Sequence, residues 1–309
     1  MTLEVGDPAA TVAAAAIDGE HLVKRFGKVV AVNDLSFQVF PGEVVGFLGP
    51  NGAGKTTTIR MLMGFIRPTT GTGLVLGGRL SDQPALRRQV GYLPGDFRVD
   101  EGLTGWELLS WFGSLRGGFN RTRVEQLAER LHLDPKRKFS DLSKGNRQKI
   151  GIVQAFMHEP KVLILDEPTS GLDPLIQREF LELVAEAKHR GAAVFFSSHV
   201  LPEVSRVADR VAIIRLGQLI SVSTVDALLD KARHRLELRY ASAVDADRFR
   251  AVPGVVAVEG SGRNLVITVD GPVGPAMQVA SSHDGLLRVS SAGDELEEIF
   301  VSLYGEAQS

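Results

Sequence analysis

The chain has 309 residues, of which 44% are hydrophobic, so it is long enough for one large domain or a large domain with a smaller one. Its formal net charge of −2 gives no long-range attraction to nucleic acid, and we expect no nucleic-acid partner. The absence of cysteine excludes disulfides, thiol catalysis and cysteine-ligated metals within the chain, and no apolar run approaches the roughly 18 residues that a membrane-spanning helix needs.

The N-terminal part of the sequence predicts a leader followed by β-structure. Residues 1–18 contain an alanine-rich run without a preceding basic segment, so we interpret them as a flexible leader and not as a signal peptide. Residues 29–32 and 35–40 are typical of strands, with a turn at Asn33 and Asp34. A short apolar strand over 43–48 then leads through a glycine-rich turn into a helix over 56–65. This order predicts an α/β fold with a parallel sheet.

Residues 97–157 are expected to be mostly helical. Thr104 and Glu107 have the spacing of a capping box, which predicts that a helix begins at Thr104. Four apolar residues follow the spacing of one helix face, namely Val124, Leu127, Ala128 and Leu131. For the two tryptophans, Trp106 and Trp111, core packing is the favoured role and a partner-facing groove is the alternative.

The α/β pattern resumes after this helical region. Strands are predicted over 161–165, 192–197 and 211–215. Asp173, followed by proline, should open a helix that Gly191 ends. The large α/β domain is therefore predicted to extend over 19–230, with a helical subdomain at about 97–157.

A small α+β domain is predicted over 231–309. It has strand patterns at 236–240, 255–259 and 265–269, helix patterns at 245–251 and 275–281, and an apolar helix face over 295–305.

A phosphate-binding loop follows the strand at 43–48. The pattern G-x-x-x-x-G-K-[ST] is matched by Gly49, Pro50, Asn51, Gly52, Ala53, Gly54, Lys55 and Thr56. Its glycines let successive amides turn toward a phosphate, and the following helix directs its positive end at the same anion. Lys55 would bind the β- and γ-phosphates, the Thr56 hydroxyl would bind Mg²⁺, and Thr57 completes the predicted nucleotide site. A chance glycine-rich loop is disfavoured by the strand before it and the helix after it.

Two carboxylates, Asp166 and Glu167, follow the apolar strand Val162–Leu165. The ends of parallel strands meet at one edge of a sheet, so both acids should lie beside the phosphate loop. Asp166 can hold Mg²⁺, and Glu167 can take a proton from an attacking water. Two acids after a strand are more often a helix N-cap, but the phosphate loop favours the catalytic interpretation.

A segment between these motifs resembles the signature loop, written LSGGQ, of the ABC ATPase family. It comprises Ser143, Lys144, Gly145 and Asn146, preceded by Leu142. A helix should follow it, giving a second anion-binding helix N-terminus, although a simple serine N-cap is the alternative. The resemblance implies that this loop closes on the ATP held by the other subunit of a dimer.

Other motifs of that family follow in the family's order. The resemblance assigns a D-loop, which contacts the opposite subunit, to Ser170, Gly171, Leu172 and Asp173. It makes His199 the residue that touches the γ-phosphate, and Phe26 the aromatic residue that stacks on adenine. A departure occurs at Gly95, where the family usually has a glutamine that meets Mg²⁺ and the attacking water. Asp96 can substitute as a ligand, or the contact is absent.

The resemblance covers residues 16–227 and implies an ATPase that dimerises with a second copy or a homologous cassette. The loops at 92–96 and 143–146 and the tail at 296–305 look like the ABC-2-type exporter branch. This implies integral membrane permease subunits as partners, a peripheral position at the cytoplasmic face of the cell membrane, and drug or antibiotic efflux. The alternatives are a soluble ABC ATPase acting on nucleic acid or ribosomes and a nucleotide sensor without hydrolysis. The single cassette without sustained heptads disfavours the first, and Glu167 with His199 disfavours the second.

Overall fold

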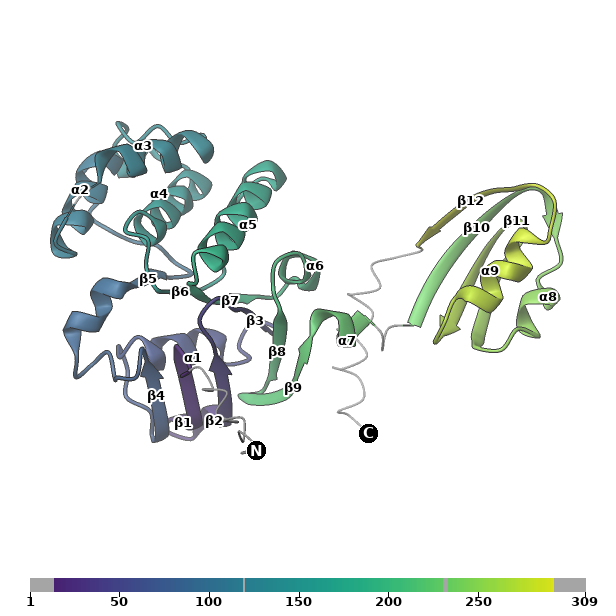
Figure 1. The fold of residues 1–309 in the computed structure, drawn as a ribbon, viewed down its shortest axis with the longest axis horizontal. Coiled ribbons are helices and arrows are strands. Elements are labelled where there is room, and N and C mark those ends of the chain that lie inside the picture. The colour runs from purple at the N-terminus through teal and green to yellow at the C-terminus, as the bar shows by residue number, and fades with distance from the viewer. Residues whose placement is uncertain (1–13, 119, 230–232, 292–309) are drawn as a thin grey trace, which may run out of the picture.

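The computed structural model describes residues 14–118, 120–229 and 233–291, and it has the α/β architecture that the sequence predicts (Figure 1). A six-stranded sheet in the order β5-β6-β7-β3-β8-β9 lies at the centre. Its strands are parallel except for β9, which pairs antiparallel with β8. The bounds are β3 Val44–Leu48, β5 Val90–Leu93, β6 Val162–Leu165, β7 Ala193–Ser198, β8 Arg210–Arg215 and β9 Gln218–Thr224.

The central sheet separates two hydrophobic cores. Successive strand residues face opposite sides, so Val44 contributes to one core and Val45 to the other. Helices α4 (Lys144–Phe156) and α5 (Pro174–His189) cover the first face, and α1 (Lys55–Leu62) lies on the second (Figure 1). Burial on both faces explains why β3, β6 and β7 are apolar throughout most of their length.

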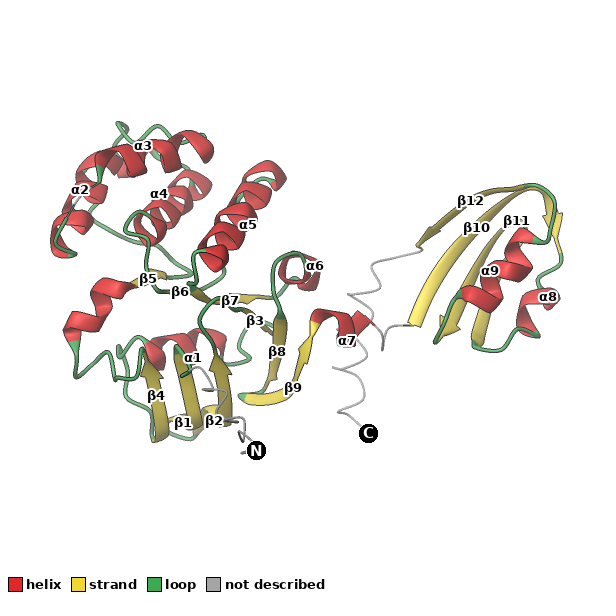
Figure 2. Ribbon diagram, in the orientation of Figure 1, coloured by secondary structure: helices red, strands yellow, loops and turns green. Residues whose placement is uncertain are grey.

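A smaller antiparallel sheet, in the order β2-β1-β4, packs over α1 (Figure 2). Its strands are β1 Ile17–Phe26, β2 Val29–Val39 and β4 Thr70–Val75. The predicted turn at Asn33 and Asp34 is wrong, because both residues lie within β2. The strand is irregular at this point: its pairing with β1 shifts in register, and Asp34 has a φ of 56°. Strand β1 begins at the buried Ile17, so the last two residues of the predicted leader belong to this sheet.

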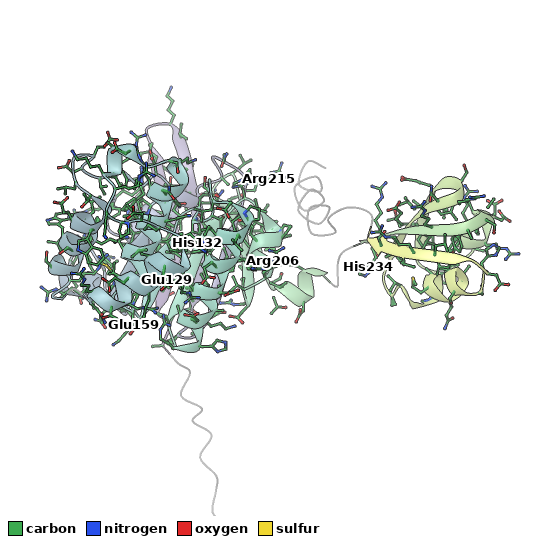
Figure 3. The ribbon with its side chains drawn as sticks, turned by 90° about the horizontal axis from the view of Figure 1, so that it is seen from above. Glu129, His132, Glu159, Arg206, Arg215 and His234 are labelled. Carbon is green, nitrogen blue, oxygen red and sulfur yellow. The ribbon has the colours of Figure 1, made fainter. Side chains whose placement is uncertain are left out.

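The helical region has the predicted start and the predicted apolar face. Helix α2 (Gly105–Leu115) follows the Thr104 capping box. The four apolar residues predicted to face inward are all buried: three lie in α3 (Arg121–Arg130), and Leu131 is the residue that caps its C-terminus. Of the two short 3₁₀ turns, η1 Pro84–Gln89 precedes β5 and η2 Phe139–Asp141 lies between α3 and α4. Trp106 packs against the core, but Trp111 is 54% exposed, so core packing was wrong for this second tryptophan. Figure 3 labels Glu129 and His132 near the end of α3 and Glu159 just beyond α4.

After β7 the chain forms α6 Leu201–Ser205 and, following β9, α7 Val225–Leu229. Among the described residues, no helix is both long and apolar enough to cross a membrane.

Residues 233–291 form a three-stranded antiparallel sheet, β11-β10-β12, with its own hydrophobic cluster. The elements are β10 Arg233–Val244, α8 Asp247–Arg250, β11 Val255–Asp270, α9 Gly274–Ser281 and β12 Leu286–Ser291. Both strand patterns predicted at 255–269 lie in β11. This element folds back on itself, because the Asp270 amide donates to the Gly254 carbonyl at 2.7 Å. Strand β12 was not predicted. The helix predicted over 295–305 and the boundary at 230–231 lie outside the described residues.

Candidate functional site

The loop between β3 and α1 requires glycine at two positions. A Cβ on Gly49 would lie 2.4 Å from the Ile214 carbonyl oxygen, and one on Gly54 would lie 2.6 Å from the Ala31 carbonyl oxygen. Gly54 also has a φ of 111°, which side chains disfavour. As the N-cap of α1, Gly54 offers no side-chain acceptor to the first helical amides. These amides and the helix dipole therefore form an anion-binding end.

Lys55 connects this loop to the acidic end of β6. Its side chain is almost fully buried, and its ammonium donates to the carbonyls of Gly49 and Pro50. The same ammonium lies 3.1 Å from Oε1 of Glu167. That Glu167 oxygen is buried and makes no hydrogen bond to the described residues. The geometry therefore concentrates one positive and one negative charge at the mouth of the loop.

The acidic pair lies at the edge where the strands of the central sheet end. Asp166 is 2% exposed, and its carboxylate accepts a hydrogen bond from the Ser197 hydroxyl at 2.6 Å. Oε2 of Glu167 lies 2.8 Å from Nδ1 of His199. Glu167 has a φ of 46°, a conformation that costs a residue with a side chain roughly 1–2 kcal/mol. The surrounding contacts must offset this strain.

Many predicted site residues line two adjoining pockets that share Asn51, Thr56 and Glu167. The first is otherwise lined by the phosphate loop: Ala31, Pro50, Gly52, Gly54, Lys55 and Thr57. The second adds Arg60, Tyr92, Pro94, Gly95, Asp96, Asp166, Ser170 and His199. The structure thus brings together the phosphate loop, the acidic pair and His199, which are far apart in the sequence. This arrangement suits a nucleoside triphosphate with Mg²⁺, because it combines a helix N-terminus, a buried lysine and a hydroxyl near two carboxylates.

Tyr92 and Arg60 were not predicted as site residues. Burial, together with the nearby Asp166 carboxylate, raises the pKa of Tyr92 to about 12, while the charge of Arg60 opposes this rise. The phenol is therefore neutral at physiological pH. Arg60 adds a positive charge to the lining of the pocket that also contains Asp166 and Glu167.

The loop in which the family's glutamine is replaced lies directly against Asp166. A Cβ on Gly95 would be 3.4 Å from Oδ2 of Asp166, so Gly95 places its main chain beside this carboxylate. Asp96 lines the same pocket but is largely exposed, and its carboxylate pairs with Arg98 at 2.7 Å. Within the described residues, no group of three or more acidic or histidine side chains could hold a metal ion by itself. A Mg²⁺ ion here would need phosphate or water ligands as well.

The predicted signature loop and D-loop contact each other within the chain. Ser143 caps α4 and accepts a hydrogen bond from the Asn146 amide at 3.3 Å. A Cβ on Gly145 would lie 2.7 Å from the Gly171 carbonyl oxygen, so this contact requires glycine. Lys144 reaches the Ser170 hydroxyl at 3.4 Å. None of the four predicted signature residues lines the two pockets described above.

The remaining D-loop residues stabilise the fold, because Asp173 caps α5 and Leu172 is buried. Phe26 is 51% exposed, with the Lys24 ammonium 5.1 Å from its ring centre, and it does not line the phosphate-loop pocket. Its predicted contact with adenine stays a prediction.

Two further polar residues contact the acidic pair and were missed. Ser197 bonds to both acids, and the Gln148 side chain donates to the carbonyls of Glu167 and Pro168 at 3.3 and 3.1 Å. Both side chains are almost fully buried. The available signal for Ser197 was a polar residue closing an otherwise apolar strand, since a buried polar group requires a partner.

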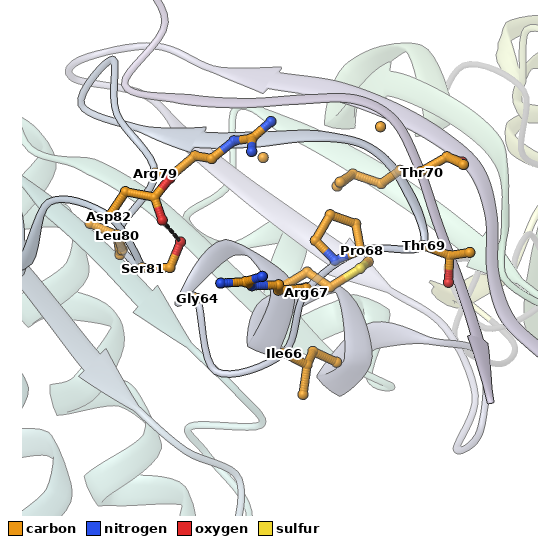
Figure 4. A pocket seen from close by; sticks show the side chains of 14 residues that line it. Gly64, Ile66, Arg67, Pro68, Thr69, Thr70, Arg79, Leu80, Ser81 and Asp82 are labelled. Carbon is orange, nitrogen blue, oxygen red and sulfur yellow. Dashed lines mark hydrogen bonds between the residues drawn. The ribbon is translucent and has the colours of Figure 1, made fainter.

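A separate hollow lies between the end of α1 and β4 (Figure 4). Its polar lining includes Arg67, Arg79 and Ser81, and Ser81 donates to Asp82 at 2.8 Å. It contains neither Lys55 nor the acidic pair, so we do not include it in the candidate site.

Comparisons with known proteins agree with this geometry. The family model described as ABC transporter matches residues 32–170. The chain is 40% identical over 209 residues to an uncharacterised ABC transporter ATP-binding protein of Nostoc sp., covering 65% of this chain and 62% of that protein. It thus spans less than two thirds of that relative's length. It is 37% identical over 228 residues to the bacitracin transport ATP-binding protein BcrA of Enterococcus faecalis, covering 72% of this chain and 73% of the relative.

A solved ATP-binding subunit of an ABC transporter has a similar structure. It superimposes with a TM-score of 0.64 at 33% sequence identity, covering 69% of this chain and 91% of that one. The motif order, the geometry of the site and these similarities lead to one conclusion: the chain belongs to the ABC transporter ATP-binding proteins, a family of ATPases.

Proposed function

We propose that this chain hydrolyses Mg-ATP at a composite dimer interface and drives a separate membrane permease of an exporter. The observation that carries the proposal is the cluster in which Lys55 and His199 flank the two sides of the Glu167 carboxylate. A cation for phosphate, a carboxylate base and an imidazole are the groups that phosphoryl transfer to water needs.

The residues of one subunit divide the chemistry among them. Lys55 offsets the charge of the β- and γ-phosphates, and the amides of the phosphate loop orient them. Glu167 orients the attacking water and accepts its proton, while His199 contacts the γ-phosphate. Thr56 and Asp166 would hold Mg²⁺, which when bound neutralises developing negative charge on the phosphates. Asp96 and the main chain at Gly95 are the candidates for contacts at the position of the missing glutamine.

The second subunit supplies the signature loop. Ser143 caps α4, yet neither it nor its predicted partners, Lys144, Gly145 and Asn146, lines the phosphate pocket of its own chain. The N-terminus of α4 would instead meet the γ-phosphate bound by another copy or a homologous cassette. The D-loop, from Ser170 to Asp173, would contact the opposite subunit, and Phe26 would stack on adenine.

We propose that the helical region contacts the permease. Trp111 and Leu115 are both more than half exposed on α2, which is unusual for large apolar side chains close together on one helix. Another pocket is lined by residues 95–99, Glu101, Lys144 and Arg147, and therefore includes Gly95, which lies beside Asp166. A movement of residues 95–99 would therefore change the position of the main chain beside Asp166. The exposed apolar side chains on α2 support a membrane partner, and the similarity to the bacitracin transport protein supports an exporter of drugs or antibiotics. Such a subunit would lie at the cytoplasmic face of the membrane.

A mixed-dimer experiment tests the composite site. One tagged copy carries Lys55→Ala and a differently tagged copy carries Ser143→Arg, and each homodimer is expected to be inactive. In the mixed dimer both lesions fall on the same site, so the other site is intact and ATPase activity returns. If purified mixed dimers stay inactive, crosslinking of Ser143→Cys to Asn51→Cys decides. The chain has no other cysteine, and an intrasubunit bond would refute the composite site.

A further inference from the structure

Ser197 occupies the one strand that lies between the phosphate-loop strand and the acidic strand. Strand β7 pairs in parallel with β3 on one side and with β6 on the other. Leu165, the last residue of β6, pairs with Phe196, so the residues that follow them, Asp166 and Ser197, lie side by side. The sheet register therefore places a hydroxyl at the point where the two carboxylates begin.

The hydroxyl of Ser197 makes one hydrogen bond to each acidic residue. It donates to Oδ1 of Asp166 at 2.6 Å and accepts from the main-chain amide of Glu167 at 2.9 Å. Ser197 is fully buried, so bulk water does not compete for either bond. A hydroxyl can donate and accept at a single atom, whereas an alanine, a valine or a carboxylate at this position could not do both.

These bonds hold Glu167 in the conformation that aims its side chain. Its φ of 46° lies in the left-handed region, which turns the chain sharply after Asp166. The Ser197 hydroxyl fixes the amide side of Glu167, and the Gln148 side chain fixes its carbonyl side. With the main chain held on both sides, the carboxylate reaches Lys55 and His199 in separate directions.

Resting on the proposed function, we infer that Ser197 is a positioning residue for the ATPase reaction. It orients the Asp166 carboxylate for Mg²⁺ and holds the Glu167 main chain so that its carboxylate faces the attacking water. Ser197 touches neither phosphate nor water itself, and it acts through the two acids.

The adjacent serine provides a matched control. Ser198 is also buried at the end of β7, but its hydroxyl contacts Val200 and Glu203 in the following turn and helix and does not bond to Asp166 or Glu167. Ser197→Ala and Ser198→Ala therefore remove the same atom from neighbouring buried positions, and they differ in whether the acidic pair loses its partner.

The test measures kcat, KM for ATP and the Mg²⁺ concentration for half-maximal rate in the full chain. Ser197→Ala should lower kcat roughly 10- to 100-fold, the range typical of groups that orient a metal ligand. It should raise the Mg²⁺ requirement and leave KM for ATP near the wild-type value, because the phosphate loop is unchanged. Ser198→Ala should keep kcat near wild type.

Three outcomes would overturn the inference: a wild-type kcat in Ser197→Ala, an equal loss in both serine variants, or a loss confined to KM. Glu167→Gln, measured alongside, separates this from failure of the proposed function. An active Glu167→Gln variant would remove the proposed mechanism itself, whereas an inactive one beside a fully active Ser197→Ala variant would remove only the role of Ser197.

Discussion

Replacing Glu167 with glutamine is the sharpest test of the proposed chemistry. Glutamine has nearly the same shape as glutamate, so it can keep the contact with the His199 imidazole. In wild type this contact joins Nδ1 of His199 and Oε2 of Glu167 at 2.8 Å. The main-chain bonds from Ser197 and Gln148 do not involve the substituted group. The change therefore removes charge and basicity while it leaves the position of the side chain intact.

The expected loss in kcat is about 10²- to 10⁴-fold, which is the usual contribution of a positioned general base. The affinity for Mg-ATP, in contrast, should not fall. In wild type the Lys55 ammonium lies 3.1 Å from the Glu167 carboxylate, and both side chains are largely shielded from water. Neutralising the carboxylate removes a negative charge that repels the γ-phosphate, so the affinity for Mg-ATP should be unchanged or higher.

Phosphate release measured in single and multiple turnovers gives kcat, and equilibrium binding of a fluorescent ATP analogue gives the affinity. The ATP-bound dimer should also accumulate in size-exclusion chromatography, because hydrolysis no longer reopens it. Glu167→Asp is the matched control, since it keeps the charge and shortens the side chain. Turnover by Glu167→Gln within about threefold of wild type would refute the assignment of Glu167 as base, and loss of ATP binding would point to a structural role.

Other changes have separate expected outcomes. Lys55→Ala should weaken Mg-ATP binding at least about 10-fold, or about 1.4 kcal/mol, in a titration, since it removes a buried cation from the loop; an unchanged Kd would contradict the role of Lys55 in binding phosphate. Gly145→Ala should lower ATPase activity, because its Cβ would lie 2.7 Å from the Gly171 carbonyl oxygen and push the signature loop and D-loop apart; normal turnover would show that this contact is dispensable. Gln148→Ala should lower kcat more than ATP affinity, as the Glu167 carbonyl loses its donor, and equal effects on both would argue against this. Removal of residues 233–309 should leave a soluble chain that binds ATP, because residues 238–280 supply their own hydrophobic cluster, and complete insolubility would show a shared core.

The nucleotide machinery could be predicted from the sequence because its physics is local. A phosphate loop needs glycines, a lysine and a hydroxyl at fixed spacing, and the segment from Gly49 to Thr56 has them. The capping box at Thr104 and the N-cap at Asp173 are likewise decided within a single turn of helix. For the same reason the predicted strand ends carrying Asp166 and His199 agree closely with β6 and β7.

Tertiary structure decided what depends on pairing between distant segments. The irregularity at Asn33 and Asp34 looks like a turn in isolation, but pairing with β1 keeps it within a single strand. Trp111 is a large apolar residue of the kind that usually packs in a core, and yet it is exposed, because burial depends on which face of the helix meets a neighbouring element. The register of β6 against β7 alone places the Ser197 hydroxyl between Asp166 and Glu167, 31 and 30 residues away in the chain. Spacing in sequence carries no information about such a contact, because it arises only when the sheet is assembled.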